Sequence, residues 1–159
     1  MDTAQRDEAA ASTGGAPRAR RIPTLVTAGL DAAALALFAL AARIAHNSPD
    51  TPLTFGSWAA TLMPFLIGLA LGWAILAAGA ARREHADGRG SLGALAAPLN
   101  PGGLTIWLST SVVGLLVWSL IHNRIPHWSF PVVATLMCAV LFLGWRGVVA
   151  AARRFARRG

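Results

Sequence analysis

Four long apolar segments constrain this chain more than any other feature of its sequence. They cover about residues 23–45, 58–81, 104–122 and 130–150, and the last three contain no charged residue except Arg146. A helix rises about 1.5 Å per residue, so about 20 apolar residues cross a hydrocarbon core about 30 Å thick. The sequence therefore predicts four transmembrane helices.

A β-barrel does not fit these segments. Barrel strands alternate apolar and polar residues, whereas runs such as LIGLALGWAILAAGAA do not alternate. Helices also satisfy their own backbone polar groups in lipid, and a composition of 55% hydrophobic and 13% charged residues is too apolar for an ordinary soluble domain. Short connections at 47–57 and 123–129 force neighbouring helices to run antiparallel. We therefore predict an all-α integral membrane protein in which four antiparallel transmembrane helices form a bundle.

The basic residues predict the orientation of this bundle. All fourteen are arginine, and the loops richest in Lys and Arg normally stay in the cytoplasm. If the first helix leaves the cytoplasm, the outer side holds Arg43 and Arg124 alone. The inner side then holds twelve, namely Arg6, Arg18, Arg20, Arg21, Arg82, Arg83, Arg89, Arg146, Arg153, Arg154, Arg157 and Arg158. We expect a multi-pass protein of the plasma membrane with both termini in the cytoplasm.

The bundle is flanked by two basic segments. Residues 1–22 are expected to be disordered, 23–151 form the transmembrane domain, and 152–159 form a basic cytoplasmic tail. The net charge of +7 follows from this topology, so the expected partners of the basic ends are anionic lipid headgroups and not nucleic acid. The inner connection 82–103 holds either a short interfacial helix or an irregular loop. A cleavable signal peptide is a less favoured alternative, because the first apolar run is long and contains Asp31.

Asp31 is a carboxylate inside the first apolar segment. A charge at bilayer depth costs about 2.5 to 3.5 kcal/mol on insertion scales, so ionisable residues there usually face the bundle and pair. At about 1.5 Å per residue, Asp31 and Arg146 lie at overlapping depths on the cytoplasmic side of the midplane. We predict an ion pair between the first and fourth helices. Ser109 and Thr110 of the third helix lie in the same layer and are predicted to complete a polar network.

The second helix contains a pair of glycines one turn apart. Gly68 and Gly72 form a small-xxx-small motif, which lets another helix approach closely. That partner is either another helix of the same chain or a second copy in a homo-oligomer. Pro64 removes a backbone donor from this helix and is expected to bend it.

A second polar cluster is predicted at the outer ends of the helices. It comprises Arg43, His46, His122 and His127, with Asp50 nearby. Imidazoles suit zinc, copper and iron, but no HxxxH or HxH spacing appears. We therefore expect no metal site and no cofactor. Near the helix ends, the side chains that fit an aromatic belt are Trp58, Trp107 and Trp128.

Several short motifs, in their order and spacing, resemble a known family. They are Asp31, Phe38, Arg43 and His46 in the first helix, PFLIGLALGW at 64–73, GLTIWLST at 103–110 and GWRG at 144–147. Over about residues 25–150 the chain resembles the family of small bacterial and archaeal membrane proteins called domain of unknown function 3054. It departs from the family pattern at Trp118, where a basic residue is usual, and at Ala42, where Gly is usual. The resemblance implies a four-helix integral membrane protein and no particular activity.

The sequence leaves three classes of function open. It contains no phosphate-binding loop, paired-cysteine motif, GxSxG motif or intramembrane carboxylate pair, so we do not expect an enzyme. The favoured class is a structural or accessory membrane protein stabilised by the Asp31 network. The alternative is a homo-oligomeric channel or transporter that uses Asp31 as a proton or cation site. A redox, lipid-modifying or metal-handling protein is the third class.

Overall fold

The computed structural model describes residues 24–87, 101–156 and 158, which form four helices and no strand. The helices are α2 (Thr24–Ala45), α3 (Phe55–Asp87), α4 (Pro101–His122) and α5 (Ser129–Phe155). All four are long and apolar enough to cross a membrane, which confirms the all-helical prediction with four such helices. The predicted disordered segment 1–22 and most of the connection 82–103 lie outside the described residues.

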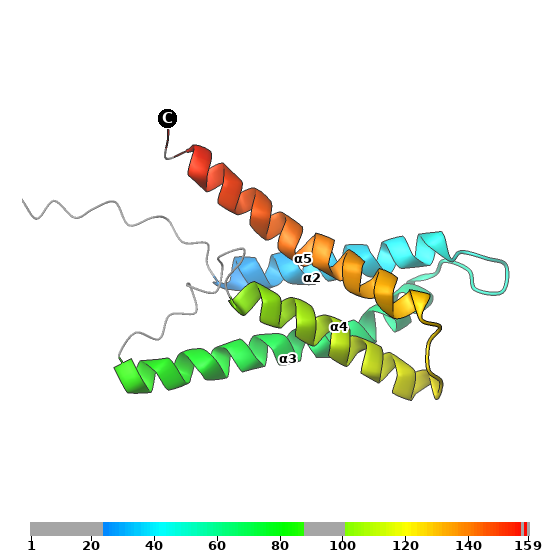
Figure 1. Ribbon diagram of the computed structural model, residues 1–159. Helices are drawn as coiled ribbons and strands as arrows, with labels where there is room; N and C mark the ends of the chain where they lie inside the picture. Colours follow the sequence, from blue (N-terminus) through cyan, green and yellow to red (C-terminus); the bar gives the residue numbers. More distant parts are fainter. Residues whose placement is uncertain (1–23, 88–100, 157, 159) are drawn as a thin grey trace, which may run out of the picture.

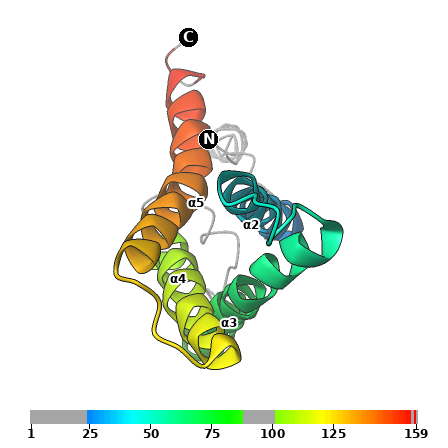
Figure 2. The same cartoon turned by 90° about the vertical axis from the view of Figure 1, so that its right-hand side faces the viewer.

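The four helices form a ring in chain order. Each packs against the next, and α5 also packs against α2 (Figure 2). The connections 46–54 and 123–128 lie at the same end of the ring, which we call the loop end (Figure 1). The opposite end, which we call the tail end, holds the start of α2 and the C-terminal turns of α5 (Figure 1). The final turns of α5 diverge from the other helices at this end.

Local sequence fixes two helix ends at the loop end. Before α3, the backbone N–H of Ser57 donates to Thr54 Oγ1 and that of Thr54 donates to Ser57 Oγ, a reciprocal arrangement of the capping-box type. After α4, Asn123 adopts a positive φ of 47°, and the N–H of the next residue, Arg124, bonds to the carbonyl of Ser119. This is a Schellman turn, in which Asn replaces the usual Gly. The turn directs the chain back over the end of α4.

The interior of the ring combines an apolar layer with buried polar groups. Leu35 and Phe38 of α2 meet Phe65 of α3 and Phe142 of α5 in one core cluster, and the rings of Phe38 and Phe65 lie edge to face with centroids 5.1 Å apart. Among the described residues, five polar side chains are also buried: Thr27, Asp31, Thr110, Ser111 and Arg146.

The outside of the ring is apolar. Large apolar side chains are exposed on every helix, for example Leu37, Leu71, Leu116 and Val140. In water such a surface would cost free energy over its whole area, whereas hydrocarbon solvates it. The distribution of side chains therefore supports a multi-pass membrane protein.

Candidate functional site

Asp31 of α2 and Arg146 of α5 face each other inside the bundle. Arg146 donates from NH1 to Asp31 Oδ1 at 2.6 Å and from NH2 to Asp31 Oδ2 at 2.7 Å. The exposed fractions are 0% for Asp31 and 1% for Arg146. The ion pair expected from the matched depths of the two residues is therefore present. Because both carboxylate oxygens accept from one guanidinium fork, the pair fixes distance and orientation together.

Neighbouring side chains hold this pair in place. Trp145 Nε1 donates to Asp31 Oδ1 at 3.1 Å, and the guanidinium carbon of Arg146 lies 4.6 Å from the centre of the Trp145 ring. Arg146 NH1 also donates to the carbonyl of Phe142, one turn earlier in α5. The indole nitrogen of Trp73, from α3, is close to the same carboxylate but lacks hydrogen-bond geometry and has no partner. Sequence reasoning missed both tryptophans, although the GWRG motif places Trp145 beside the buried arginine.

The prediction was wrong for the two hydroxyls of α4. Ser109 Oγ donates to the backbone carbonyl of Gly68 at 2.9 Å, and Thr110 Oγ1 is buried without a hydrogen-bond partner. Neither bonds to Asp31 or Arg146, because the oxygens of Asp31 already accept from α5. The close approach of α3 also gives Ser109 a nearer acceptor. Equal depth in the membrane did not imply contact.

The glycine pair of α3 is used inside the chain. A Cβ added to Gly68 would lie 2.7 Å from the backbone oxygen of Ser109, and one added to Gly72 would lie 3.2 Å from the Ile106 side chain. The motif therefore packs against α4 and is not available to a second copy. Pro64 lies inside α3 and is fully buried.

A side-chain hydrogen bond joins every pair of adjacent helices in the ring. Trp58 Nε1 of α3 donates to the Ala36 carbonyl of α2, and Trp107 Nε1 of α4 donates to the Thr135 carbonyl of α5. Ser109 joins α4 to α3, and the Asp31–Arg146 pair joins α5 to α2. We call these the four inter-helix ties. Trp58 and Trp107, expected in an aromatic belt, thus also bind across helix interfaces.

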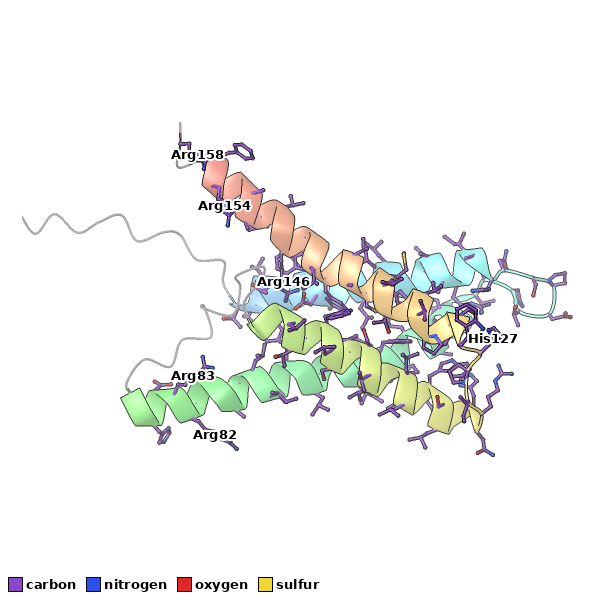
Figure 3. All side chains as sticks on the ribbon, viewed as in Figure 1. Arg82, Arg83, His127, Arg146, Arg154 and Arg158 are labelled. Atoms are coloured by element: carbon purple, nitrogen blue, oxygen red, sulfur yellow. The ribbon has the colours of Figure 1, made fainter. Side chains whose placement is uncertain are left out.

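The predicted outer cluster surrounds one cavity, which we call the loop-end cavity. Its volume is about 580 Å³, and Arg43, His46, His122 and His127 all line it. Asp50 lines a smaller adjoining cavity of about 360 Å³. His127 marks this end in Figure 3, far from the arginines labelled at the tail end.

Sequence reasoning missed two further residues of this cavity, Trp118 and Arg124. The guanidinium carbon of Arg124 lies 5.4 Å from the centre of the Trp118 ring. The cation that lies over Trp118 therefore comes from the connection after α4 and not from α4 itself. The signal in the sequence was Asn123, whose turn brings Arg124 back over the helix.

The described part of the chain offers little for metal chemistry. Within it, no three His, Cys, Asp or Glu side chains lie close enough together to hold a metal ion. Cys138 is a buried free thiol in the apolar core.

Comparison with known families gives a match. The model of a family described as "Protein of unknown function (DUF3054)" matches residues 28–149, which include α3 and α4, most of α2 and α5, and both polar sites. No curated protein and no solved structure matches the chain.

Proposed function

The chain belongs to the DUF3054 family of proteins of unknown function, and we propose its role from its own geometry. We propose that it is a structural or accessory integral membrane protein and not an enzyme. The observation that carries this proposal is the buried, bidentate Asp31–Arg146 pair. Asp31 accepts three hydrogen bonds, two from Arg146 and one from Trp145. A carboxylate held in this way stabilises one arrangement of helices.

The charge balance supports the same role. A lone carboxylate or guanidinium inside a bilayer is costly, whereas the bidentate pair has no net charge. Its two members come from α2 and α5, the first and last helices of the ring. The pair thus closes the ring at an interface between helices that are distant in the sequence.

The alternative is a homo-oligomeric channel or transporter that uses Asp31 as a proton or cation site. Such a site needs a route to water, whereas Asp31 is fully buried. Toward the loop end, Phe38 and Phe65 of the apolar core lie between Asp31 and the loop-end cavity. A cation would also have to displace Arg146 from the carboxylate. The geometry therefore favours the structural role.

Removal of the charge on Asp31 tests the proposal. Asp31→Asn leaves the buried guanidinium of Arg146 unpaired, so we expect the free energy of unfolding to fall by about 3 to 5 kcal/mol. The double variant Asp31→Asn with Arg146→Met removes both charges and should recover most of the loss. Thermal unfolding of the purified full chain in detergent measures both effects, and Arg158→Gln at the exposed tail end serves as a control for charge removal.

Proteoliposomes made with the same variants separate the two functions. A structural role predicts no proton or cation flux above that of empty vesicles for the wild type. Flux that is present in the wild type and lost in a folded Asp31→Asn variant would instead establish the transport function. Normal melting of Asp31→Asn would contradict the structural role of the pair.

The proposal includes a topology. We infer that the helices run antiparallel across the plasma membrane, that the loop end faces outward and that both termini are cytoplasmic. The support is the distribution of exposed arginines, since Arg82, Arg83, Arg154 and Arg158 gather toward the tail end (Figure 3). That end should also attract anionic lipid headgroups.

A further inference from the structure

The loop-end cavity is a second polar site, independent of the ion pair. All four helices and both loop-end connections contribute to its wall. Its volume of about 580 Å³ lies within the range of about 300 to 1,000 Å³ that is usual for small-molecule sites.

The wall of this cavity is strongly basic. It contains the guanidinium groups of Arg43 and Arg124 and the imidazoles of His46, His122 and His127, and no carboxylate among the described residues that line it. Asp50 lines the smaller adjoining cavity. The balance of charge on the described wall of the loop-end cavity favours an anion.

Several donors at the cavity remain unused. Arg43 Nη2 donates to the carbonyls of Thr51 and Pro52, which fixes that guanidinium. The Arg124 side chain makes no hydrogen bond in the described structure, so its donors are unused. His122 contacts the Trp118 carbonyl through Nδ1, and His127 contacts Ser129 through Nδ1. In the described structure neither ring bonds through Nε2. Nδ1 of His122 donates to a carbonyl, which leaves Nε2 as the acceptor of the neutral ring. Nδ1 of His127 accepts from the Ser129 N–H, which leaves Nε2–H of His127 as an unused donor.

The basic groups are also held in position before any ligand binds. The His122 ring stacks on Trp118 with centroids 4.2 Å apart and planes 18° apart, and Phe130 packs against the same indole at 5.0 Å. Arg124 lies over Trp118 as well. Preorganised side chains lose less conformational entropy on binding, and Trp118 acts as their common support.

We propose that the loop-end cavity binds a phosphate group, carried either by a lipid headgroup or by a small soluble molecule. A guanidinium presents paired N–H donors that match the oxygens of a phosphate. Two guanidiniums meet its charge, and the Nε2–H of His127 supplies a further donor. Ile125 and Phe130 add apolar surface to the wall, which suits the organic part of a phosphate ester. The cavity lies at the end of the bundle, where lipid headgroups lie in a membrane.

The test uses the purified full chain in detergent and two kinds of probe. Native mass spectrometry measures retention of phosphatidylglycerol, with diacylglycerol as the matched lipid that lacks phosphate. Titration calorimetry measures binding of inorganic phosphate and of glycerol 3-phosphate. Arg124→Gln is the informative variant, because the Arg124 side chain is exposed and makes no hydrogen bond in the described structure, and the backbone bond of Arg124 to Ser119 does not depend on the side chain. Arg158→Gln removes the same charge from the exposed tail end and is the matched control.

We expect one bound phosphate ligand per chain and an affinity about tenfold lower in Arg124→Gln, the size expected for losing a charged contact. Arg158→Gln should stay within about twofold of the wild type. Retention of phosphatidylglycerol alone identifies a lipid source, and binding of the soluble probes identifies a soluble one. The proposal would be overturned if Arg124→Gln and Arg158→Gln weakened phosphate binding equally, or if diacylglycerol were retained as well as phosphatidylglycerol. It would also be overturned if no phosphate probe bound. His122→Gln provides a second variant at the same wall, with melting recorded for each protein.

Discussion

At the scale of single residues, the buried pair raises the question of what Arg146 contributes beyond charge. Its NH1 bonds to both Asp31 and the Phe142 carbonyl, and its guanidinium lies against Trp145. Its Nε is nevertheless buried without a partner. Buried ion pairs often contribute more to the choice of one arrangement than to net stability. We interpret this pair as setting the register of α5 against α2.

Trp145 provides a milder test of the same contact. In Trp145→Phe the hydrogen bond to Asp31 is lost, while an aromatic ring remains beside Arg146. We expect the free energy of unfolding to fall by roughly 1 kcal/mol, the usual net value of one hydrogen bond. Chemical denaturation in detergent measures the change. Trp128→Phe is the control, since Trp128 is exposed and its indole nitrogen makes no hydrogen bond in the described structure. An equal loss in both variants would contradict the role given to Trp145.

The ion pair was predictable from the sequence because a charged side chain in the membrane interior has few possible partners. Opposite charges at one depth in hydrocarbon have few other partners, so depth alone brought Asp31 and Arg146 together. Depth does not give the rotation of a helix about its axis. Ser109 shares the layer but faces the backbone of α3, and the unpredicted Trp145 reaches Asp31 because its indole is long enough.

At the scale of elements, α3 and α4 pack most closely where α3 has no side chain. The backbone of α4 at Ser109 and Thr110 occupies the space beside Gly68. Ser109 then reaches the Gly68 carbonyl, so close packing and a hydrogen bond coincide at one point. In lipid this matters because helix association gains no hydrophobic free energy and depends on van der Waals contact and polar bonds.

Alanine at two positions of α3 tests this contact. The Cβ of Gly68→Ala would lie 2.7 Å from Ser109 O and 2.9 Å from Thr110 Cα, so one helix must move. We expect a loss of about 1 to 3 kcal/mol, as for other overpacked sites. Gly79→Ala is the control in the same helix, because its Cβ meets no atom of another helix within 4 Å. Thermal melting compares them, and an undisturbed Gly68→Ala would refute the close contact.

The helices themselves were predictable in number and approximate position, since length and apolar character fix them. Their ends were less so. The apolar segment predicted over 58–81 lies inside a helix that runs from Phe55 to Asp87. Its first turn depends on hydrogen bonds between Thr54 and Ser57, and its last turns contain charged residues that hydropathy does not assign to a membrane span.

At the scale of the whole molecule, the four inter-helix ties hold the helices in a ring, and the apolar exterior of this ring suits a lipid environment. The wall of the loop-end cavity combines the ends of helices with two connections. The sequence predicted part of this wall, the cluster of Arg43 and three histidines. It did not show that the Schellman turn at Asn123 would place Arg124 over Trp118.

The ion pair also changes the charge count that predicts orientation. Arg146 is neutralised by Asp31 inside the bundle, so it does not act as a flanking charge. Of the twelve arginines assigned to the inner side, eleven then remain, against Arg43 and Arg124 at the loop end. The asymmetry persists, and it still predicts that the tail end is cytoplasmic.

Cysteine labelling on intact cells tests this orientation. The native thiol, Cys138, is buried, and Cys138→Ala gives a background without reactive cysteine. In that background, Asp50→Cys places a thiol at the loop end and Glu84→Cys places one near the tail end of α3, both at exposed positions. A maleimide that cannot cross membranes should label Asp50→Cys in intact cells and Glu84→Cys only after permeabilisation. The reverse labelling pattern would show that the proposed orientation is wrong and that the loop end faces the cytoplasm. Phosphate binding measured in detergent would not change, because it does not depend on orientation.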